Sequence, residues 1–298
     1  MLADIYDEPF ADYSQIPTFL VSQFARGQVT VALSGDGGDE LFGGYNRYTG
    51  LARAWAMKER SPLLVGGAAR LLSHVPAEAI RAGASLLRRR RLPPAFGFKA
   101  ARALSALRAE SLDEFVSEFS AEWTRSGFPA GERAAPSAGA PLAGADSAQR
   151  LMLADIQSYL PDDILVKVDR ASMAVGLEAH APFLDHRVAE LSARLAPRLK
   201  VRGGTGKHLL RRLLAREAPP ALFDRPKAGF TLPLGEWLRG PLREWAETML
   251  APSRLAQSGL LDPAPIATVW RDHLRGKRDA SLPLWSILMF EAWRERWK

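Results

Sequence analysis

Carboxylates and glycines alternate in one short segment of the chain, Ser34-Gly35-Asp36-Gly37-Gly38-Asp39-Glu40, which we call the acidic turn. Asp36, Asp39 and Glu40 supply the hard oxygen ligands that Mg²⁺ prefers, and Mg²⁺ usually shares such ligands with substrate phosphates. The glycines let the backbone approach a ligand closely and adopt a positive φ. The segment therefore predicts a magnesium–nucleotide site. Taken alone, it is more typical of a turn that caps a helix beginning near Asp39, and only the motifs that accompany it favour the site.

Two lysines further along the chain carry the charge that a phosphate site requires. Lys227 lies in Arg225-Pro226-Lys227-Ala228-Gly229, and Lys207 lies in the first turn of an expected helix. The positive end of the helix dipole disfavours a cation there, so Lys207 indicates an anionic partner. The flexible stem of lysine also suits a mobile loop such as the one expected around Lys227. The alternative for each lysine is an ordinary surface cation.

A strand must hold the acidic turn in place. Val29–Leu33 alternates β-branched and small residues and predicts such a strand, and a short helix from Pro17 to Arg26 precedes it. The acidic turn then stands at the carboxyl end of the strand, where open α/β sheets bind their ligands. Leu199–Val201 could add one more strand. A parallel strand needs neighbours, so the sequence predicts a predominantly α-helical chain with one clear strand and an incomplete sheet.

Composition narrows the class of protein. The 298 residues contain no cysteine, which excludes disulfides, a thiolate metal site and a cysteine nucleophile. No apolar run reaches the ~18–20 residues that span a bilayer. The acidic start has no signal-peptide pattern, so we expect a cytoplasmic protein with no membrane partner. The net charge of +7 includes Arg88–Arg91, beside an expected helix end, which favours a solvated surface over a nucleic-acid contact.

Several motifs occur together with the acidic turn and in a fixed order. They are Asp7–Asp12, Tyr159–Ala174, Gly176–Arg187, Gly206–Arg211 and Arg225–Phe230. Taken together, the chain resembles the synthetase domain of class B, glutamine-dependent asparagine synthetases, a domain that recurs in β-lactam and carbapenam synthetases. The resemblance implies an α/β fold, with a parallel sheet like that of the adenine nucleotide alpha-hydrolases.

The resemblance also implies an activity, with ATP and Mg²⁺ as cofactors. The family activates aspartate or a related carboxylate as an acyl-adenylate, which ammonia from a glutaminase domain then attacks. By this resemblance Ser34, Gly35 and Gly37 bind the nucleotide and Asp39 binds Mg²⁺. The residues carried over to catalytic positions are Asp36, Lys227, Lys207 and Glu178. His180 stands where the family usually has an arginine, which changes the substrate contact expected there.

The chain lacks two parts of the family pattern. The Ser-Gly-Gly-x-Asp-Ser pyrophosphate loop is absent, and so is the glutaminase domain with its cysteine nucleophile. We therefore expect 1–298 to be the C-terminal part of an asparagine synthetase domain, truncated before that loop and inactive or nearly so alone. Its divisions are expected to be site-bearing segments 1–48 and 149–240, a helical insertion 49–148 and C-terminal helices 241–298.

Other functions stay open at this point. The chain could be a non-catalytic remnant or an accessory subunit that needs a partner polypeptide, or it could form a homodimer. A third reading is a basic nucleic-acid-binding module that uses Arg88–Arg91. For single residues, Asp185 is expected to cap the helix that runs through Leu195. The tryptophans of the final third are expected to pack helices together.

Overall fold

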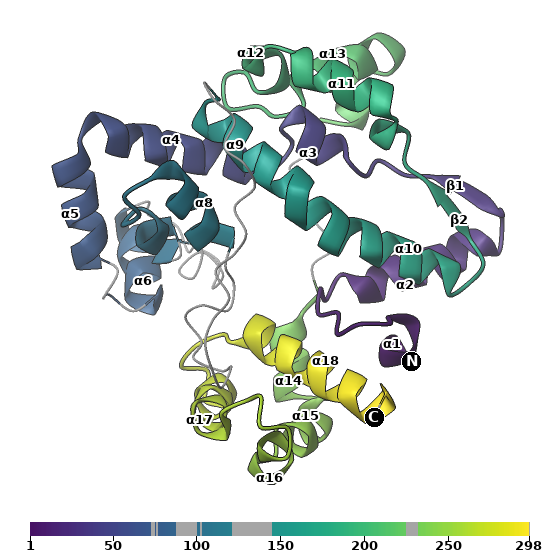
Figure 1. The fold of residues 1–298 in the computed structure, drawn as a ribbon, viewed down its shortest axis with the longest axis vertical. Helices are drawn as coiled ribbons and strands as arrows, with labels where there is room; N and C mark the ends of the chain where they lie inside the picture. Colours follow the sequence, from purple (N-terminus) through teal and green to yellow (C-terminus); the bar gives the residue numbers. More distant parts are fainter. Residues whose placement is uncertain are drawn as a thin grey trace.

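The computed structural model describes residues 1–72, 75, 77–87, 100–101, 103–120, 145–224 and 232–297 (Figure 1). Arg88–Arg91 and Lys227 lie outside this described part. The described chain is predominantly helical, as the sequence predicts, and contains a two-stranded parallel sheet. None of the described helices is both long and apolar enough to cross a membrane.

The described residues of the first half of the chain form one strand and a series of helices. Its elements are α1 (Leu2–Ile5), α2 (Gln15–Arg26), β1 (Val31–Leu33), α3 (Gly38–Phe42), α4 (Asn46–Arg60), α5 (Pro62–Leu72), α6 (Ala77–Leu87), α8 (Leu112–Ser120) and α9 (Ser147–Ala154).

The second half begins with a π-helix that continues into α10. Its elements are η1 (Asp155–Leu165), α10 (Val166–Met173), β2 (Glu178–His180), η2 (Pro182–Leu184), α11 (His186–Arg194), α12 (Pro197–Lys200), α13 (His208–Glu217), η3 (Pro220–Leu222), α14 (Leu234–Arg239), α15 (Arg243–Met249), α16 (Pro252–Ala256), α17 (Pro263–Leu274) and α18 (Ser281–Trp297).

The expected strand before the acidic turn is confirmed as β1, and its partner is β2. The two strands run parallel, with Val31 opposite Glu178 and Leu33 opposite His180. The prediction of a strand at Leu199–Val201 is wrong. The backbone there forms α12, which begins at Pro197, and the fixed φ of proline at the first helical position favours a helix.

One face of this strand pair is uncovered in the described structure. α10 lies alongside α2 and contacts β2, so these helices cover the other face (Figure 1). Val31 is 45% and Leu33 75% exposed, although both are apolar strand residues. β1 also pairs along one edge only among the described residues. The incomplete sheet expected from the sequence is therefore confirmed.

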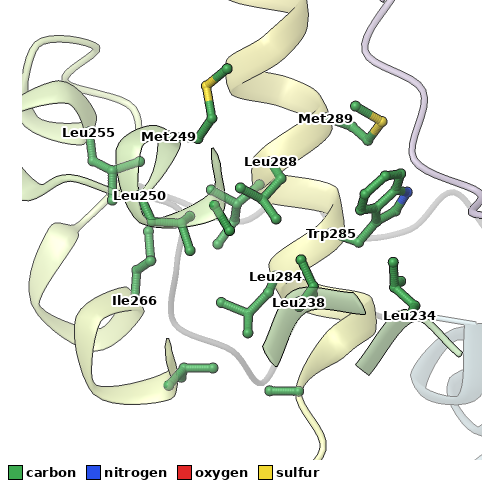
Figure 2. Packing of buried hydrophobic residues seen from close by; sticks show 14 residues of the cluster. Leu234, Leu238, Met249, Leu250, Leu255, Ile266, Leu284, Trp285, Leu288 and Met289 are labelled. Atoms are coloured by element: carbon green, nitrogen blue, oxygen red, sulfur yellow. The ribbon is translucent and has the colours of Figure 1, made fainter. Parts of the chain in front are cut away.

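Two separate hydrophobic clusters hold the helices. The first joins α14–α18 around Leu238, Leu284 and Leu288, all 0% exposed, and packs Trp285 among them (Figure 2). Trp237, Trp245 and Trp270 pack against its margin, which confirms helix packing as the role of these tryptophans. The second cluster joins α4, α5, α8 and α9. The helix that follows the acidic turn, α3, contacts η1, α9, α11 and α13, so helices from distant parts of the chain hold the turn.

Candidate functional site

A cavity of about 1200 Å³ opens at the carboxyl end of β1. Its walls come from the segment Phe10–Ser14, α2, β1, η1, α10 and the start of α18. The lining is strongly acidic. It contains the carboxylates Asp12, Asp36, Asp39, Asp155, Asp162 and Asp163 and the cations Arg47 and Lys167. A cavity of this size and polarity can hold a charged ligand as large as a nucleotide.

The acidic turn reaches this cavity because Gly37 reverses the chain. Gly37 has φ 82°, and a Cβ added there would lie 2.4 Å from Leu184 Cδ2. The chain then enters α3, whose first turn contains Asp39 and Glu40. Asp36 and Asp39 both line the cavity. A helix does begin near Asp39, as the sequence predicts, but its N-cap is Gly37 and no side chain caps it.

Ser34 places its side-chain hydroxyl at the wall of the cavity. Its backbone N–H donates to the carbonyl of His180 at 2.7 Å, which fixes the residue at the end of β1. Its Oγ is buried, lines the cavity and has no hydrogen-bond partner among the described residues. Buried polar atoms are normally paired, so an unpaired hydroxyl at a cavity wall indicates a position for a ligand atom. Gly35, the next residue, is exposed, and no atom lies within 4 Å of a Cβ added there.

Lys207 joins the acidic turn through an ion pair. Its Nζ lies 3.1 Å from Asp39 Oδ2, and its backbone N–H donates to the carbonyl of Phe42 at 3.1 Å. Lys207 is the N-cap of α13, as expected from its position at the start of a helix. The contact requires glycines, because a Cβ added at Gly206 would lie 2.2 Å from the carbonyl oxygen of Gly43.

Glu178 lies apart from these residues. It pairs with Val31 at the start of β1, its carboxylate contacts His180 Nε2 at 2.6 Å, and it is not in the cavity lining. Its side chain is 65% exposed on the uncovered face of the strand pair. The structure therefore places Ser34, Asp36 and Asp39 on the cavity, with Lys207 paired to Asp39 but outside the lining, and leaves Glu178 apart from them. Lys227 cannot be placed, because it lies outside the described residues.

The π-helix η1 lies in the expected site-bearing segment 149–240, but none of its cavity residues was chosen as a site residue from the sequence. Asp155, Ser158, Tyr159, Asp162 and Asp163 all lie on η1 and all line the cavity. π-helical segments are rare and occur frequently at functional sites. The available signal was Pro161, which lies within an otherwise helical pattern and disturbs the i to i−4 hydrogen bonds there.

An arginine packed among tyrosines ties η1 to the acidic turn. Arg47 pairs with Asp155 at 2.7 Å, and its guanidinium lies 4.3 Å from the ring centre of Tyr45 and 4.9 Å from that of Tyr159. Tyr45 donates its hydroxyl to Glu40 at 2.6 Å, and Glu40 is only 1% exposed. Burial raises the pKa of Glu40, partly opposed by this hydrogen bond. Inside the cavity wall, the positive charge of Arg47 thus balances the negative charge of Asp155.

A second charged group joins η1 to α10 and to the segment before α2. Lys167 is buried and contacts Asp12 and, at 3.4 Å, Asp163. Asp12 is also held by the backbone N–H of Ser14 at 2.8 Å. Burial and the nearby charge of Asp12 raise the pKa of Asp163 to about 7, despite Lys167. One proton is therefore shared in this group near neutral pH.

The described residues fit Mg²⁺ only as part of a larger ligand set. They contain no group of three or more histidine, cysteine, aspartate or glutamate side chains arranged to hold a metal ion. Asp36 and Asp39 nevertheless both border the cavity. Mg²⁺ in nucleotide sites typically takes one or two carboxylates and completes its shell with waters and phosphate oxygens. The site therefore suits a cation that arrives together with a nucleotide.

Comparison with known proteins gives a consistent result. The family model described as asparagine synthase matches residues 1–295. Asparagine synthetase [glutamine-hydrolyzing] 1 of Bacillus subtilis is 31% identical over 296 residues, covering 97% of this chain and 44% of the relative. A Mycobacterium tuberculosis relative, whose name also places it among the glutamine-hydrolysing asparagine synthetases, is 35% identical over 289 residues, covering 96% of this chain and 42% of the relative.

Human asparagine synthetase [glutamine-hydrolyzing] is 37% identical over a shorter stretch of 76 residues, which covers 24% of this chain and 13% of the relative. The chain thus spans about two fifths of the length of the bacterial relatives that it matches along most of its residues. No solved structure matches it.

Proposed function

Because the chain belongs to the asparagine synthase family, we propose that it forms part of the synthetase site of an ATP-dependent, amide-forming ligase. The proposed reaction activates aspartate or a related carboxylate as an acyl-adenylate, which ammonia then attacks. The observation that carries this proposal is the acidic turn, which presents Asp36, Asp39 and the unpaired Ser34 Oγ to one cavity at the carboxyl end of β1. Open α/β sheets bind nucleotides at this position.

In the first step a substrate carboxylate oxygen bonds to the α-phosphorus of ATP, and pyrophosphate leaves. Ser34, Gly35 and Gly37 are proposed to hold the nucleotide, and Asp39 is proposed to hold the Mg²⁺. When bound, Mg²⁺ would neutralise charge on the phosphates. The ammonium groups of Lys207 and Lys227 are also proposed to neutralise charge on the phosphates. A preorganised contact of this kind typically contributes roughly 3–4 kcal/mol to transition-state stabilisation.

In the second step the nitrogen of ammonia bonds to the activated carbonyl carbon, and AMP leaves. The nitrogen must lose a proton as the amide forms, and a carboxylate within reach of the cavity is the group that can accept it. Asp36 is proposed for this role because it lines the cavity. Glu178 faces away from the cavity, so a catalytic role for it requires a ligand that reaches the outer face of the strand pair.

The source of the ammonia and the partners of the chain are also matters of proposal. The names of the relatives state that those proteins hydrolyse glutamine. We propose by analogy that ammonia reaches this site from a glutaminase domain, in a cytoplasmic protein. The accessory-subunit alternative is favoured by the uncovered apolar face of β1, which suits a partner polypeptide or a homodimer.

Nucleotide binding by the full chain tests the proposal directly. We expect Mg–ATP to protect the backbone amides of the acidic turn from hydrogen exchange. Ser34→Ala and Asp39→Asn should each weaken binding, by about tenfold or more for the charge-bearing Asp39. Asp262→Asn, which alters an exposed carboxylate that caps α17, is the control. Absence of protection, or equal binding by all variants, would contradict the proposal.

Catalysis by the chain alone is expected to be weak or absent, since no pyrophosphate loop is present in these residues. The measurement is ATP–pyrophosphate exchange with aspartate present. Robust exchange that Lys227→Ala abolishes would show instead that residues 1–298 contain a complete adenylation site.

A further inference from the structure

The ion pair between Lys207 and Asp39 joins two residues for which the proposed function gives different tasks. Lys207 Nζ lies 3.1 Å from Asp39 Oδ2, although Lys207 is proposed to contact phosphates and Asp39 a divalent cation. The two side chains are 31% and 25% exposed, so ligands can reach both of them, and Asp39 also lines the cavity. In the ligand-free arrangement the ammonium of Lys207 is thus paired with the carboxylate oxygen of Asp39 that a metal ion would bind.

The backbone around Lys207 holds the ammonium in this place. Among the described residues Lys207 is the only non-glycine with a positive φ, at 53°. This conformation is unfavourable for a residue with a Cβ, and such strain concentrates at functional sites. Its neighbours also pack tightly. A Cβ added at Gly44 would lie 2.0 Å from Asp39 Oδ1 and 2.5 Å from Lys207 Cε. The pair is therefore built into the fold and is more than a contact between two mobile side chains.

We propose that Lys207 and a divalent cation compete for Asp39, so that metal binds tightly at the acidic turn only when phosphates draw Lys207 away. This inference rests on the proposed function, because it takes the phosphate and metal roles from it. A cation that arrives alone meets a carboxylate already neutralised by the ammonium. Nucleotide phosphates offer Lys207 another anionic partner and leave Asp39 to the metal. Phosphate binding and metal binding then strengthen one another by the same factor.

Titration with Mn²⁺ in the absence of nucleotide tests the competition, with free Mn²⁺ followed by its electron paramagnetic resonance signal. The full chain, Lys207→Met and Lys207→Gln are compared. Both variants lose the ammonium, and the methionine also keeps an unbranched stem. We expect each variant to bind Mn²⁺ about tenfold more tightly than the unaltered chain, on the scale of removing one nearby charge. Lys207→Arg keeps the charge and should bind as weakly as the unaltered chain.

Two controls locate the effect. Lys277→Met removes an exposed lysine that pairs with Asp272 far along the chain, and it should leave Mn²⁺ binding unchanged. Asp39→Asn added to Lys207→Met should abolish the gain. Circular dichroism and the midpoint of thermal unfolding show whether each variant is folded.

Equal or weaker Mn²⁺ binding by folded Lys207→Met or Lys207→Gln would overturn the competition. So would a gain that survives Asp39→Asn, because the metal would then lie elsewhere. No nucleotide is present in these titrations, so their result is independent of whether the chain binds ATP. Failure of nucleotide binding would count against the proposed function, and failure of the Mn²⁺ gain counts against the competition alone.

Discussion

Neighbouring glycines of the acidic turn have different structural requirements. Gly37 has φ 82° and packs against Leu184, whereas a Cβ at Gly35 would meet no atom within 4 Å. The sequence shows both as glycines in one short segment. Only the conformation separates a glycine that the backbone needs from one that leaves room beside the cavity.

Alanine substitution should reveal this difference. Gly37→Ala places a Cβ in the left-handed region and 2.4 Å from Leu184 Cδ2. We expect it to lower the free energy of unfolding by about 1–3 kcal/mol. Gly35→Ala in the same turn should change it by less than about 0.5 kcal/mol. Urea unfolding followed by circular dichroism measures both, and equal effects would contradict the assignment.

The buried group around Lys167 makes stability depend on pH. The pKa of Asp163 rises from 3.8 to about 7 because the carboxyl is buried and lies beside Asp12. Tyr6 and Tyr159 also face this group, and Lys167 opposes the shift. As pH rises from about 4 to about 7, the unfolded chain releases this proton while the folded chain keeps it. The contribution of Asp163 to the free energy of unfolding therefore falls over this range.

Asp163→Asn removes this titration. The variant should gain stability relative to the unaltered chain between pH 5 and pH 8, by about 1–2 kcal/mol. Asp162→Asn makes the same change at an exposed neighbour and should show no such trend. Burial raises the pKa of Asp12, but its contacts with Lys167, Ser14 and Asp163 together lower it below the usual value, so its titration acts only at lower pH. Urea unfolding at several pH values is the measurement, and parallel pH profiles for both variants would refute the prediction.

Among the elements, η1 and α18 form part of the cavity walls, although no residue of either was predicted as a site residue. η1 places carboxylates on the cavity, and the start of α18 closes it with Leu282 and Ser286. α18 is in turn held by the cluster of the C-terminal helices (Figure 2). The shape of the cavity thus depends on a hydrophobic cluster in elements that carry none of the predicted site residues.

Shortening single side chains of α18 to alanine tests whether the cluster supports this helix. Leu284 is 0% exposed in the cluster, and Leu284→Ala should lower the free energy of unfolding by about 2–5 kcal/mol. Leu282, two residues earlier in the same helix, is 44% exposed, and its change to alanine should cost less than about 1 kcal/mol. Denaturant unfolding compares them. Similar costs would mean that α18 is not anchored by this cluster.

For the whole molecule, the uncovered face of the sheet is the dominant feature. Val31 and Leu33 are apolar, exposed and on a strand with an unpaired edge among the described residues. Such edges and apolar patches favour association with other chains. The same feature that makes the sheet incomplete therefore makes the chain prone to self-association.

Leu33→Thr should reduce this association without unfolding the chain. Leu33 is 75% exposed, so its replacement removes little buried surface, and threonine keeps a good β-propensity. Light scattering as a function of protein concentration should show less association. Leu222→Thr alters a leucine that is 64% exposed but lies away from a strand edge, and it should have no comparable effect. Equal scattering by both variants would show that association occurs elsewhere.

The sequence by itself determined the features that depend on local pattern. Alternation identified β1, and the helix before it is confirmed as α2, beginning two residues earlier than expected. Asp185 caps α11 as predicted, with its side chain accepting from the N–H of Arg187. The ordered motifs identified the family. Turn, cap and strand signals are set by neighbouring residues, so they can be recognised without knowledge of the fold.

Only the tertiary structure decided which of these residues meet. β2 was not predicted, because Glu178-Ala179-His180 has no strand pattern of its own and becomes a strand by pairing with β1. That pairing turns Glu178 away from the cavity. The close packing of Gly206, just before α13, against Gly43 brings Lys207 to Asp39, although the two are far apart in the sequence. Contacts between distant segments depend on packing and on backbone geometry, and residue type and spacing do not specify either.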